Sequence, residues 1–222
     1  MDIKEICKRL LLREPKPDEG YSLTEIEEAE RRLGKELPKP LRDFYLMIGK
    51  NDLFANAFSR FVRPKSLSEE DGKLIFLEEN QSVVYWAVSE NGAVYSSENR
   101  GGGNWYDEKT DIDTFMKASL YNQCIMADES FHEDYETGFL YSGMLSAIEL
   151  RDKSLGRKLK TFLDSAWTVV ARANDLIVYE KADALMTINL TAKGDAIGEA
   201  FCCFRDEREF DDICESFRFF QI

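Results

Sequence analysis

The single histidine of the chain, His132, limits the catalytic chemistry that the sequence can support. Nucleophilic catalysis by serine or cysteine needs a base that takes up the proton of the nucleophile, and histidine is the usual base. His132 lies in the polar run Glu129–Asp134, which is typical of a solvated helix start or loop. We therefore interpret His132 as a surface histidine and assign no catalytic residue.

The cysteines show neither metal-binding nor disulfide spacing. The sequence has no Cys-X-X-Cys or His-X-X-X-His pattern. Cys202 and Cys203 are adjacent, so a strand would place one in the core and point the other outward. An odd number of cysteines is not the pattern of a secreted disulfide scaffold. We expect no metal or cofactor, and five reduced thiols at Cys7, Cys124, Cys202, Cys203 and Cys214.

Acidic pairs and a run of glycines are the remaining candidates for a chemical role, and neither has the expected pattern. Asp111/Asp113 and Asp211/Asp212 lack the loop of oxygen ligands that calcium needs, and both pairs fall at expected helix starts, where carboxylates favour the helix dipole. No two carboxylates stand out as the acid and base of a glycoside hydrolase, although composition does not exclude that chemistry. The run of three glycines at 101–103 lacks the Gly-Lys-Ser/Thr ending of a phosphate-binding loop, so we interpret it as a hairpin loop.

Aromatic residues gather around an expected strand meander and this glycine loop. They are Tyr85, Trp86, Tyr95, Trp105 and Tyr106. Strand alternation buries some of them and leaves others outside, and exposed Trp and Tyr are common interface anchors. The pattern favours the core for the two tryptophans and the surface for Tyr106 and Arg100. The candidate partner-binding residues are Arg100, Trp105, Tyr106 and Asp107.

Composition favours an acidic globular protein. Of the 222 residues, 44% are hydrophobic and 32% are charged, a balance that can bury a core. The formal net charge of -13 repels phosphate backbones and attracts basic proteins, so we expect no nucleic acid and a protein partner; acidity alone also serves solubility. The N-terminus lacks a signal peptide and no stretch suits a membrane span. We expect a cytoplasmic location.

A helix pair is the clearest predicted element. Ser22 and Glu25 form a capping box, and Gly34 suits a left-handed helix stop. The sequence predicts helices near residues 22–34 and 40–49, packed on an antiparallel sheet. The sheet is expected from residues 60–106, and a helix follows near residues 111–122. The residues expected to be largely buried are Leu33, Leu41, Phe44 and Trp86.

The last third of the chain repeats the mixture of helices and strands on a smaller scale. A polar acidic stretch precedes helices near 142–150 and 154–165 and a terminal helix at 206–217. Expected strands lie near 139–141, 167–170, 176–179, 185–190 and 199–204. The fold class is therefore α+β. The predicted domains are residues 1–126, with N-terminal helices on an antiparallel sheet, and 127–222, a smaller α+β extension.

The segment from Ile26 to Tyr45 resembles the opening of the SUKH superfamily, which contains fungal cell-wall-synthesis regulators of the Smi/Knr type and many bacterial immunity proteins. The motifs that carry the resemblance are Leu33-Gly34, Leu37-Pro38 and the pair Phe44-Tyr45, followed by Leu74-Ile75-Phe76, Tyr85-Trp86-Ala87-Val88 and Asn104-Trp105. The resemblance covers roughly residues 20–125 and leaves residues 127–222 unmatched.

The resemblance implies a non-catalytic α+β module that binds proteins. By analogy with bacterial members, the expected function is immunity against a toxin domain, and the acidic total suits a basic toxin. A regulatory scaffold of the fungal type is the alternative, and a carboxylate-dependent hydrolase is the second alternative. The sequence assigns no oligomeric state.

Overall fold

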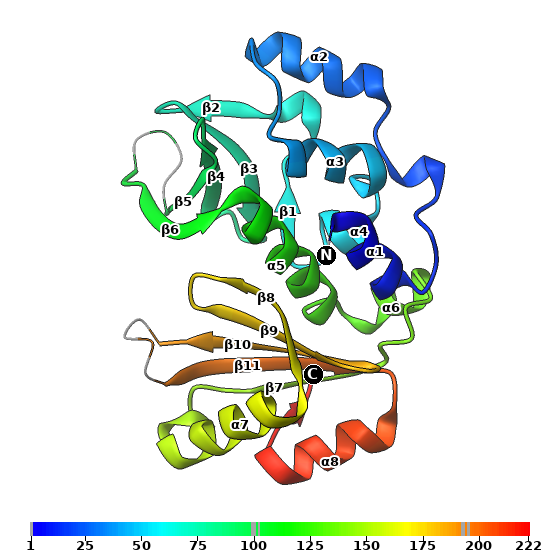
Figure 1. Cartoon of the computed structure of the whole chain (residues 1–222), viewed down its shortest axis with the longest axis vertical. Coiled ribbons are helices and arrows are strands. Elements are labelled where there is room, and N and C mark those ends of the chain that lie inside the picture. The colour runs from blue at the N-terminus through cyan, green and yellow to red at the C-terminus, as the bar shows by residue number, and fades with distance from the viewer. Residues whose placement is uncertain (1, 99–100, 102, 192–193, 195) are drawn as a thin grey trace. The chain divides into compact units, whose positions relative to one another are not determined.

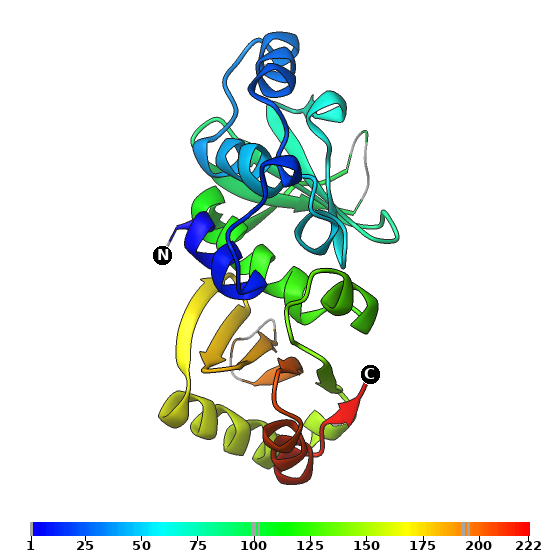
Figure 2. The same cartoon turned by 90° about the vertical axis from the view of Figure 1, so that its right-hand side faces the viewer.

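The computed structural model describes residues 2–98, 101, 103–191, 194 and 196–222. The chain divides into two compact units, Met1–Cys124 and Ile125–Ile222. Among the residues described, each unit holds helices and one six-stranded antiparallel sheet (Figures 1 and 2). The predicted α+β class is confirmed. No helix within these ranges is long and apolar enough to span a bilayer.

The first unit opens with helices joined by short turns. Their bounds are α1 (Ile3–Leu11), α2 (Leu23–Leu33), α3 (Lys39–Ile48) and α4 (Asp52–Ala55). The predicted capping box is present: the Ser22 hydroxyl accepts a hydrogen bond from Glu25 N (3.3 Å), and Glu25 Oε2 accepts one from Ser22 N (2.8 Å). Gly34 ends α2 with φ 72°, a left-handed conformation that favours glycine. The predicted helix pair is confirmed.

The sheet of the first unit has the order β1-β3-β4-β5-β6, and β2 pairs with β3. The bounds are β1 (Ser59–Phe61), β2 (Ser68–Glu70), β3 (Lys73–Glu79), β4 (Tyr85–Ser89), β5 (Ala93–Ser97) and β6 (Tyr106–Asp111). Helix α5 (Ile112–Ile125) packs on this sheet, because the Phe115 ring lies 5.6 Å from Phe76 and 6.2 Å from Trp86. Strand β6, which carries Tyr106 and Asp107 of the predicted site, is an edge strand.

The four residues predicted to be largely buried differ in how deeply they lie. Leu41 and Phe44 are fully buried. Leu33 and Trp86 are intermediate in burial and keep part of their surface in solvent. Leu33 lies between two exposed residues at the end of α2. The cross-strand neighbour of Trp86 is Ser96, whose side chain is too small to cover an indole.

The segment before α2 is fixed to the fold by Glu19. This residue ends a 3-10 turn (Pro17–Glu19) and is only 9% exposed. Its carboxylate accepts two hydrogen bonds from Arg13 (2.9 and 2.6 Å), one from Lys16 N (2.6 Å) and one from Asn51 Nδ2 (2.8 Å). Four donors from three parts of the chain therefore converge on one buried acid.

The second unit contains a sheet of order β12-β7-β11-β10-β9-β8. The strand bounds are β7 (Tyr141–Leu145), β8 (Thr168–Ala173), β9 (Leu176–Lys181), β10 (Ala184–Leu190), β11 (Ile197–Phe204) and β12 (Phe220–Gln221). The helices are α6 (Glu129–Asp134), the 3-10 turn η3 (Glu149–Arg151), α7 (Lys153–Ala166) and α8 (Glu207–Phe217). Helices α7 and α8 lie on one face of the sheet (Figure 1).

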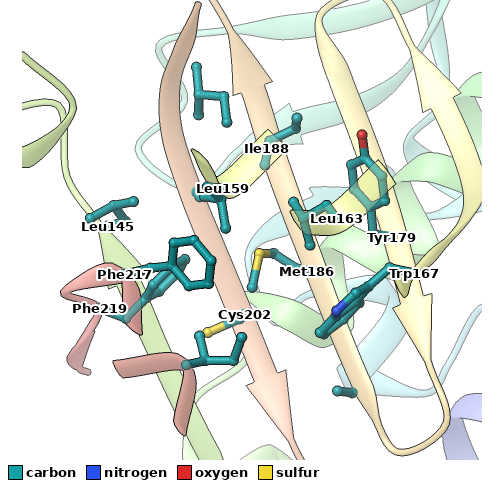
Figure 3. Packing of buried hydrophobic residues seen from close by; sticks show 14 of the residues in the cluster. Leu145, Leu159, Leu163, Trp167, Tyr179, Met186, Ile188, Cys202, Phe217 and Phe219 are labelled. Carbon is teal, nitrogen blue, oxygen red and sulfur yellow. The ribbon is translucent and has the colours of Figure 1, made fainter. Parts of the chain in front are cut away.

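The core between these helices and the sheet is apolar and continuous. Leu159 and Leu163 of α7 and Phe217 of α8 point toward Met186 and Cys202 on the sheet (Figure 3). All five side chains are at most 3% exposed. Helix α7 matches the predicted helix 154–165, because its apolar residues recur at helical spacing and face this sheet.

The helix predicted at residues 142–150 is wrong. Residues Tyr141–Leu145 form strand β7, which pairs with β11 and β12. Gly143 explains why a strand fits there, since a Cβ on Gly143 would lie 2.9 Å from Cε2 of Phe210. The Phe210 ring of α8 therefore packs directly on the strand backbone, a long-range contact that local sequence does not reveal.

The interpretation of His132 as a surface residue is also wrong. The side chain is 2% exposed, its Nδ1 lies 2.8 Å from Thr137 Oγ1, and its ring packs edge-on against Phe139. The short helix α6 turns its acidic neighbours outward and the histidine inward. A polar sequence context therefore concealed a buried side chain.

The expectation that one of Cys202 and Cys203 points outward to the surface is wrong. They point to opposite faces of β11, as strand alternation requires, yet both are fully buried. The expected outward cysteine does not exist, because the second face of this sheet is buried as well. Val178, Leu185 and Thr187 on that face are at most 1% exposed.

All five cysteines are free thiols, as predicted. Burial raises the pKa of the Cys202 thiol well above its ordinary value. The pKa of the half-buried Cys214 thiol is also raised, mainly by burial and to a smaller extent by the charge of Asp211. Because the thiolate is the reactive form, we expect slow alkylation of the native protein at Cys214 alone. Intact-mass measurement should show one adduct natively and five after denaturation; a second native adduct contradicts this expectation.

Candidate functional site

The predicted partner-binding residues lie at the start of β6. Arg100 lies outside the described residues. Trp105 immediately precedes the strand and is half-buried, Tyr106 is its first residue and is 54% exposed, and Asp107 is exposed. The structure therefore places three of the four predicted residues at one end of an edge strand.

Strand pairing separates these residues between the two faces of the sheet. Tyr106 pairs with Ser96, which pairs with Trp86, so Tyr106 lies on the face that α5 covers. Asp107 pairs with Tyr95 and lies on the opposite face. Tyr106 and Asp107 therefore project to opposite sides of one strand.

Trp105 belongs to the face that carries Asp107. Its Nε1 donates a hydrogen bond to Asp71 Oδ2 (3.3 Å), and Lys73 Nζ lies 5.6 Å from its ring. The same ammonium lies 5.1 Å from the Tyr95 ring, so one cation contacts two aromatic rings. We call the set Asp71, Lys73, Tyr95, Trp105 and Asp107 the aromatic–acidic patch.

The hairpin between β2 and β3 also orders the chain next to this patch. The backbone N–H of Gly101 donates to both carboxylate oxygens of Glu70, at 3.0 and 2.9 Å. The indole of Trp105 is held in the same way by the next acidic residue, Asp71. Acidic side chains of the hairpin thus hold Gly101 and Trp105.

The middle of β6 is bulged. The register passes from Tyr95↔Asp107 to Ala93↔Asp111, which leaves extra residues on β6. Lys109 adopts φ 54°, and its N–H donates to Asp107 Oδ1 at 2.8 Å. A bulge interrupts the ladder of an edge strand and disfavours pairing with another strand. The β6 edge therefore presents side chains more readily than a regular backbone ladder.

A second feature of the first unit was not predicted from the sequence. A groove of about 760 Å³ lies between α2 and the segment Arg63–Lys65. Tyr21 and Phe61 contribute aromatic surface to it, and charged residues of both signs line the rest. Its residues come from several elements between positions 21 and 65, so no local pattern could have revealed it.

Two cations of the groove, Lys50 and Arg32, make contacts within the fold. Lys50 Nζ lies 3.2 Å from Glu25 Oε2 and 4.8 Å from the Tyr21 ring centroid. Arg32 donates to the backbone oxygens of Leu67 (2.7 Å) and Pro64 (3.0 Å). Burial raises the pKa of Tyr21; the nearby charge of Arg63 opposes this change, and Glu25 and Asp52 add to it. The groove offers a surface of mixed charge.

The two acidic pairs, Asp111/Asp113 and Asp211/Asp212, lie differently on their helices. Asp111 accepts a hydrogen bond from Thr114 N at 2.8 Å at the start of α5, as expected for a cap. Asp211 and Asp212 lie within α8, whose N-cap is Asp206, so their interpretation as caps is wrong. In the part of the chain that the structure describes, no three His, Cys, Asp or Glu residues are grouped to hold a metal ion.

Comparison with known proteins gives no further assignment of these surfaces: no family model, curated protein or solved structure matches the chain.

Proposed function

We propose that the chain is a non-catalytic protein-binding module that contacts a basic protein partner through Tyr106 and the aromatic–acidic patch. The observation that carries this proposal is that Tyr106 is 54% exposed on one face of the β6 edge, while the other face carries a tryptophan held by a carboxylate and a lysine. Tyrosine and tryptophan in fixed positions lose little conformational freedom on binding and are common interface anchors.

Charge supports a basic partner. The chain carries a net charge of -13, and Asp71 and Asp107 lie beside the aromatic rings. Carboxylates at the rim of an interface accelerate the approach of a basic protein, and buried aromatics slow its release. The bulge in β6 favours contacts made by side chains over strand addition.

The partner that this proposal names is a bacterial toxin domain, which the chain would neutralise in the cytoplasm as an immunity protein. The support is the resemblance of Ile26–Tyr45 to the SUKH superfamily together with the acidic net charge. A pull-down with mass spectrometry identifies the partner. Recovery of a toxin domain supports immunity, whereas recovery of a cell-wall-synthesis enzyme would indicate the regulatory role.

Tyr106→Ala tests the interface. We expect it to weaken binding of the recovered partner by about 1–3 kcal/mol, the usual range for an aromatic anchor, and to leave the Tm almost unchanged, because the ring is already half in solvent. Titration calorimetry and thermal melts measure the two effects on one variant.

Two further variants control this experiment. Phe220→Ala removes another exposed ring, 44% exposed in β12, and should leave the affinity unchanged. Trp105→Ala removes the ring on the opposite face of the sheet and reports whether the partner contacts both faces. Unchanged affinity for both Tyr106→Ala and Trp105→Ala would exclude the β6 edge as the interface.

A further inference from the structure

Helix α7 in the second unit carries a stripe of positive charge in an otherwise acidic chain. Lys153, Arg157 and Lys160 follow one another at spacings of four and three residues, so they lie on one face of the helix. Like charges at this spacing repel each other. Cations in the first turns also oppose the helix dipole, and α7 has no acidic residue in its first turn. Lys153 and Arg157, at the start of the helix, therefore do not serve its stability.

The three cations differ in the contacts that they make. Lys160 forms an ion pair with Asp164 at 2.7 Å and lies over the Tyr179 ring. Lys153 and Arg157 are exposed, and neither forms an ion pair with a described residue. Two cations at the start of α7 are thus available to a ligand.

These cations border a pocket with an apolar floor. The pocket has a volume of about 130 Å³, and Leu150, Leu190 and Ile197 line it. An apolar cavity of about 150 Å³ binds benzene, so this one suits a single medium-sized apolar group. It is too small for a nucleotide or a long acyl chain. The combination of an apolar floor and a cationic rim selects a small apolar group with negative charge beside it.

Gly156 lies in the same pocket and has no structural need to be glycine. It sits inside α7, where glycine is among the least favourable residues. A Cβ added to it would lie 3.5 Å from Leu150 Cδ2 and 3.9 Å from Ile197 Cβ, which are ordinary contacts. Alanine would therefore fit and favour the helix, but its methyl group would occupy part of the pocket. The absent side chain keeps the pocket open.

We propose that this pocket binds an acidic peptide segment of a partner protein, which inserts one apolar side chain over Gly156 and places flanking carboxylates at Lys153 and Arg157. Charge complementarity selects an acidic segment, since the two cations lie one helical turn apart, a distance that neighbouring carboxylates of a peptide can match. The site is separate in chemistry from the aromatic–acidic patch, which attracts a basic partner.

The test uses the full-length protein and a synthetic peptide with one leucine between two pairs of glutamates. We expect saturable amide NMR shifts at Gly156, Arg157 and Ile197. Replacement of the peptide leucine by serine should weaken binding at least about tenfold, because the buried apolar side chain is lost. Arg157→Gln should weaken it several-fold and reduce its dependence on salt.

Gly156→Ala is the decisive variant. It should raise the Tm, because alanine favours the helix. It should also weaken binding of the peptide at least several-fold, because the methyl group of alanine fills part of the pocket. Arg172→Gln, at an exposed position on β8, is the matched control and should leave peptide affinity unchanged. A Gly156→Ala protein that binds the peptide normally overturns the proposal. Tighter binding of octanoate than of the peptide overturns it too, because the site would then take a free carboxylate.

Discussion

Gln123→Leu is expected to lower the free energy of unfolding by about 3–5 kcal/mol. The side chain lies on α5 and is 2% exposed. It forms hydrogen bonds with a segment more than 60 residues earlier in the chain. Its Oε1 accepts hydrogen bonds from Phe58 N and Ser59 N, both at 2.8 Å, and its Nε2 donates to the backbone oxygens of Phe54 (3.1 Å) and Ser59. Leucine would leave these groups without partners, and each unsatisfied buried group costs about 1–3 kcal/mol.

Urea denaturation of the wild type and the variant measures this difference. Asn122→Leu is the matched control, because Asn122 is the preceding residue of the same helix and is half-buried. We expect a change of less than about 1 kcal/mol for the control. If the two variants are equally stable, the hydrogen bonds of Gln123 contribute nothing specific to the fold.

Elements with local determinants could be predicted from the sequence. The helices α2 and α3 follow from a capping box, an apolar stripe and a left-handed glycine, all within 28 residues of chain. Strand β7 was predicted only at its first residue, Tyr141, because the conformation of the rest depends on β11, β12 and the Phe210 ring, which are about 60 to 80 residues away. The failure at His132 has a different cause: Thr137 and Phe139, which it contacts, are close in sequence, but its polar neighbours suggested an exposed position.

The candidate site was predicted as a cluster of residue types and not as a surface. Alternation along a strand separates Tyr106 from Asp107, and the sequence contains that information once the strand bounds are known. The contacts that hold Trp105 are different, because Asp71 and Lys73 come from another hairpin. Neither the groove beside α2 nor the pocket of α7 has a local sequence pattern, since side chains from distant elements form both.

Glu19→Gln is expected to lower the free energy of unfolding by about 3 kcal/mol at pH 7. Burial tends to raise the pKa of the Glu19 carboxyl, but hydrogen bonds from Arg13, Lys16 N and Asn51 and the charge of Arg13 outweigh it and lower the pKa from an ordinary 4.5 to about 2. Each pKa unit corresponds to about 1.4 kcal/mol, so this difference amounts to about 3 kcal/mol. Glutamine keeps the shape but loses the charge and an acceptor for the guanidinium.

The contribution of Glu19 depends on pH in a defined direction. The folded protein binds the Glu19 proton less tightly than the unfolded chain does, so protonation favours unfolding. The stabilisation is fully present above pH 4.5 and disappears as the pH falls through about 2. The stability difference between wild type and Glu19→Gln should therefore be largest at neutral pH and shrink steadily in acid, as unfolding at several pH values will measure.

Glu14→Gln separates this effect from the general response of an acidic protein to low pH. Glu14 is close in sequence and pairs with Lys8 at 2.6 Å, which lowers the pKa of its carboxyl, but its side chain is 56% exposed. Solvent screens such an exposed pair, so its removal should change stability far less than the removal of Glu19. Equal losses for the two variants, or a loss at Glu19 that does not change between neutral and acidic pH, would show that the buried charge does not anchor this segment.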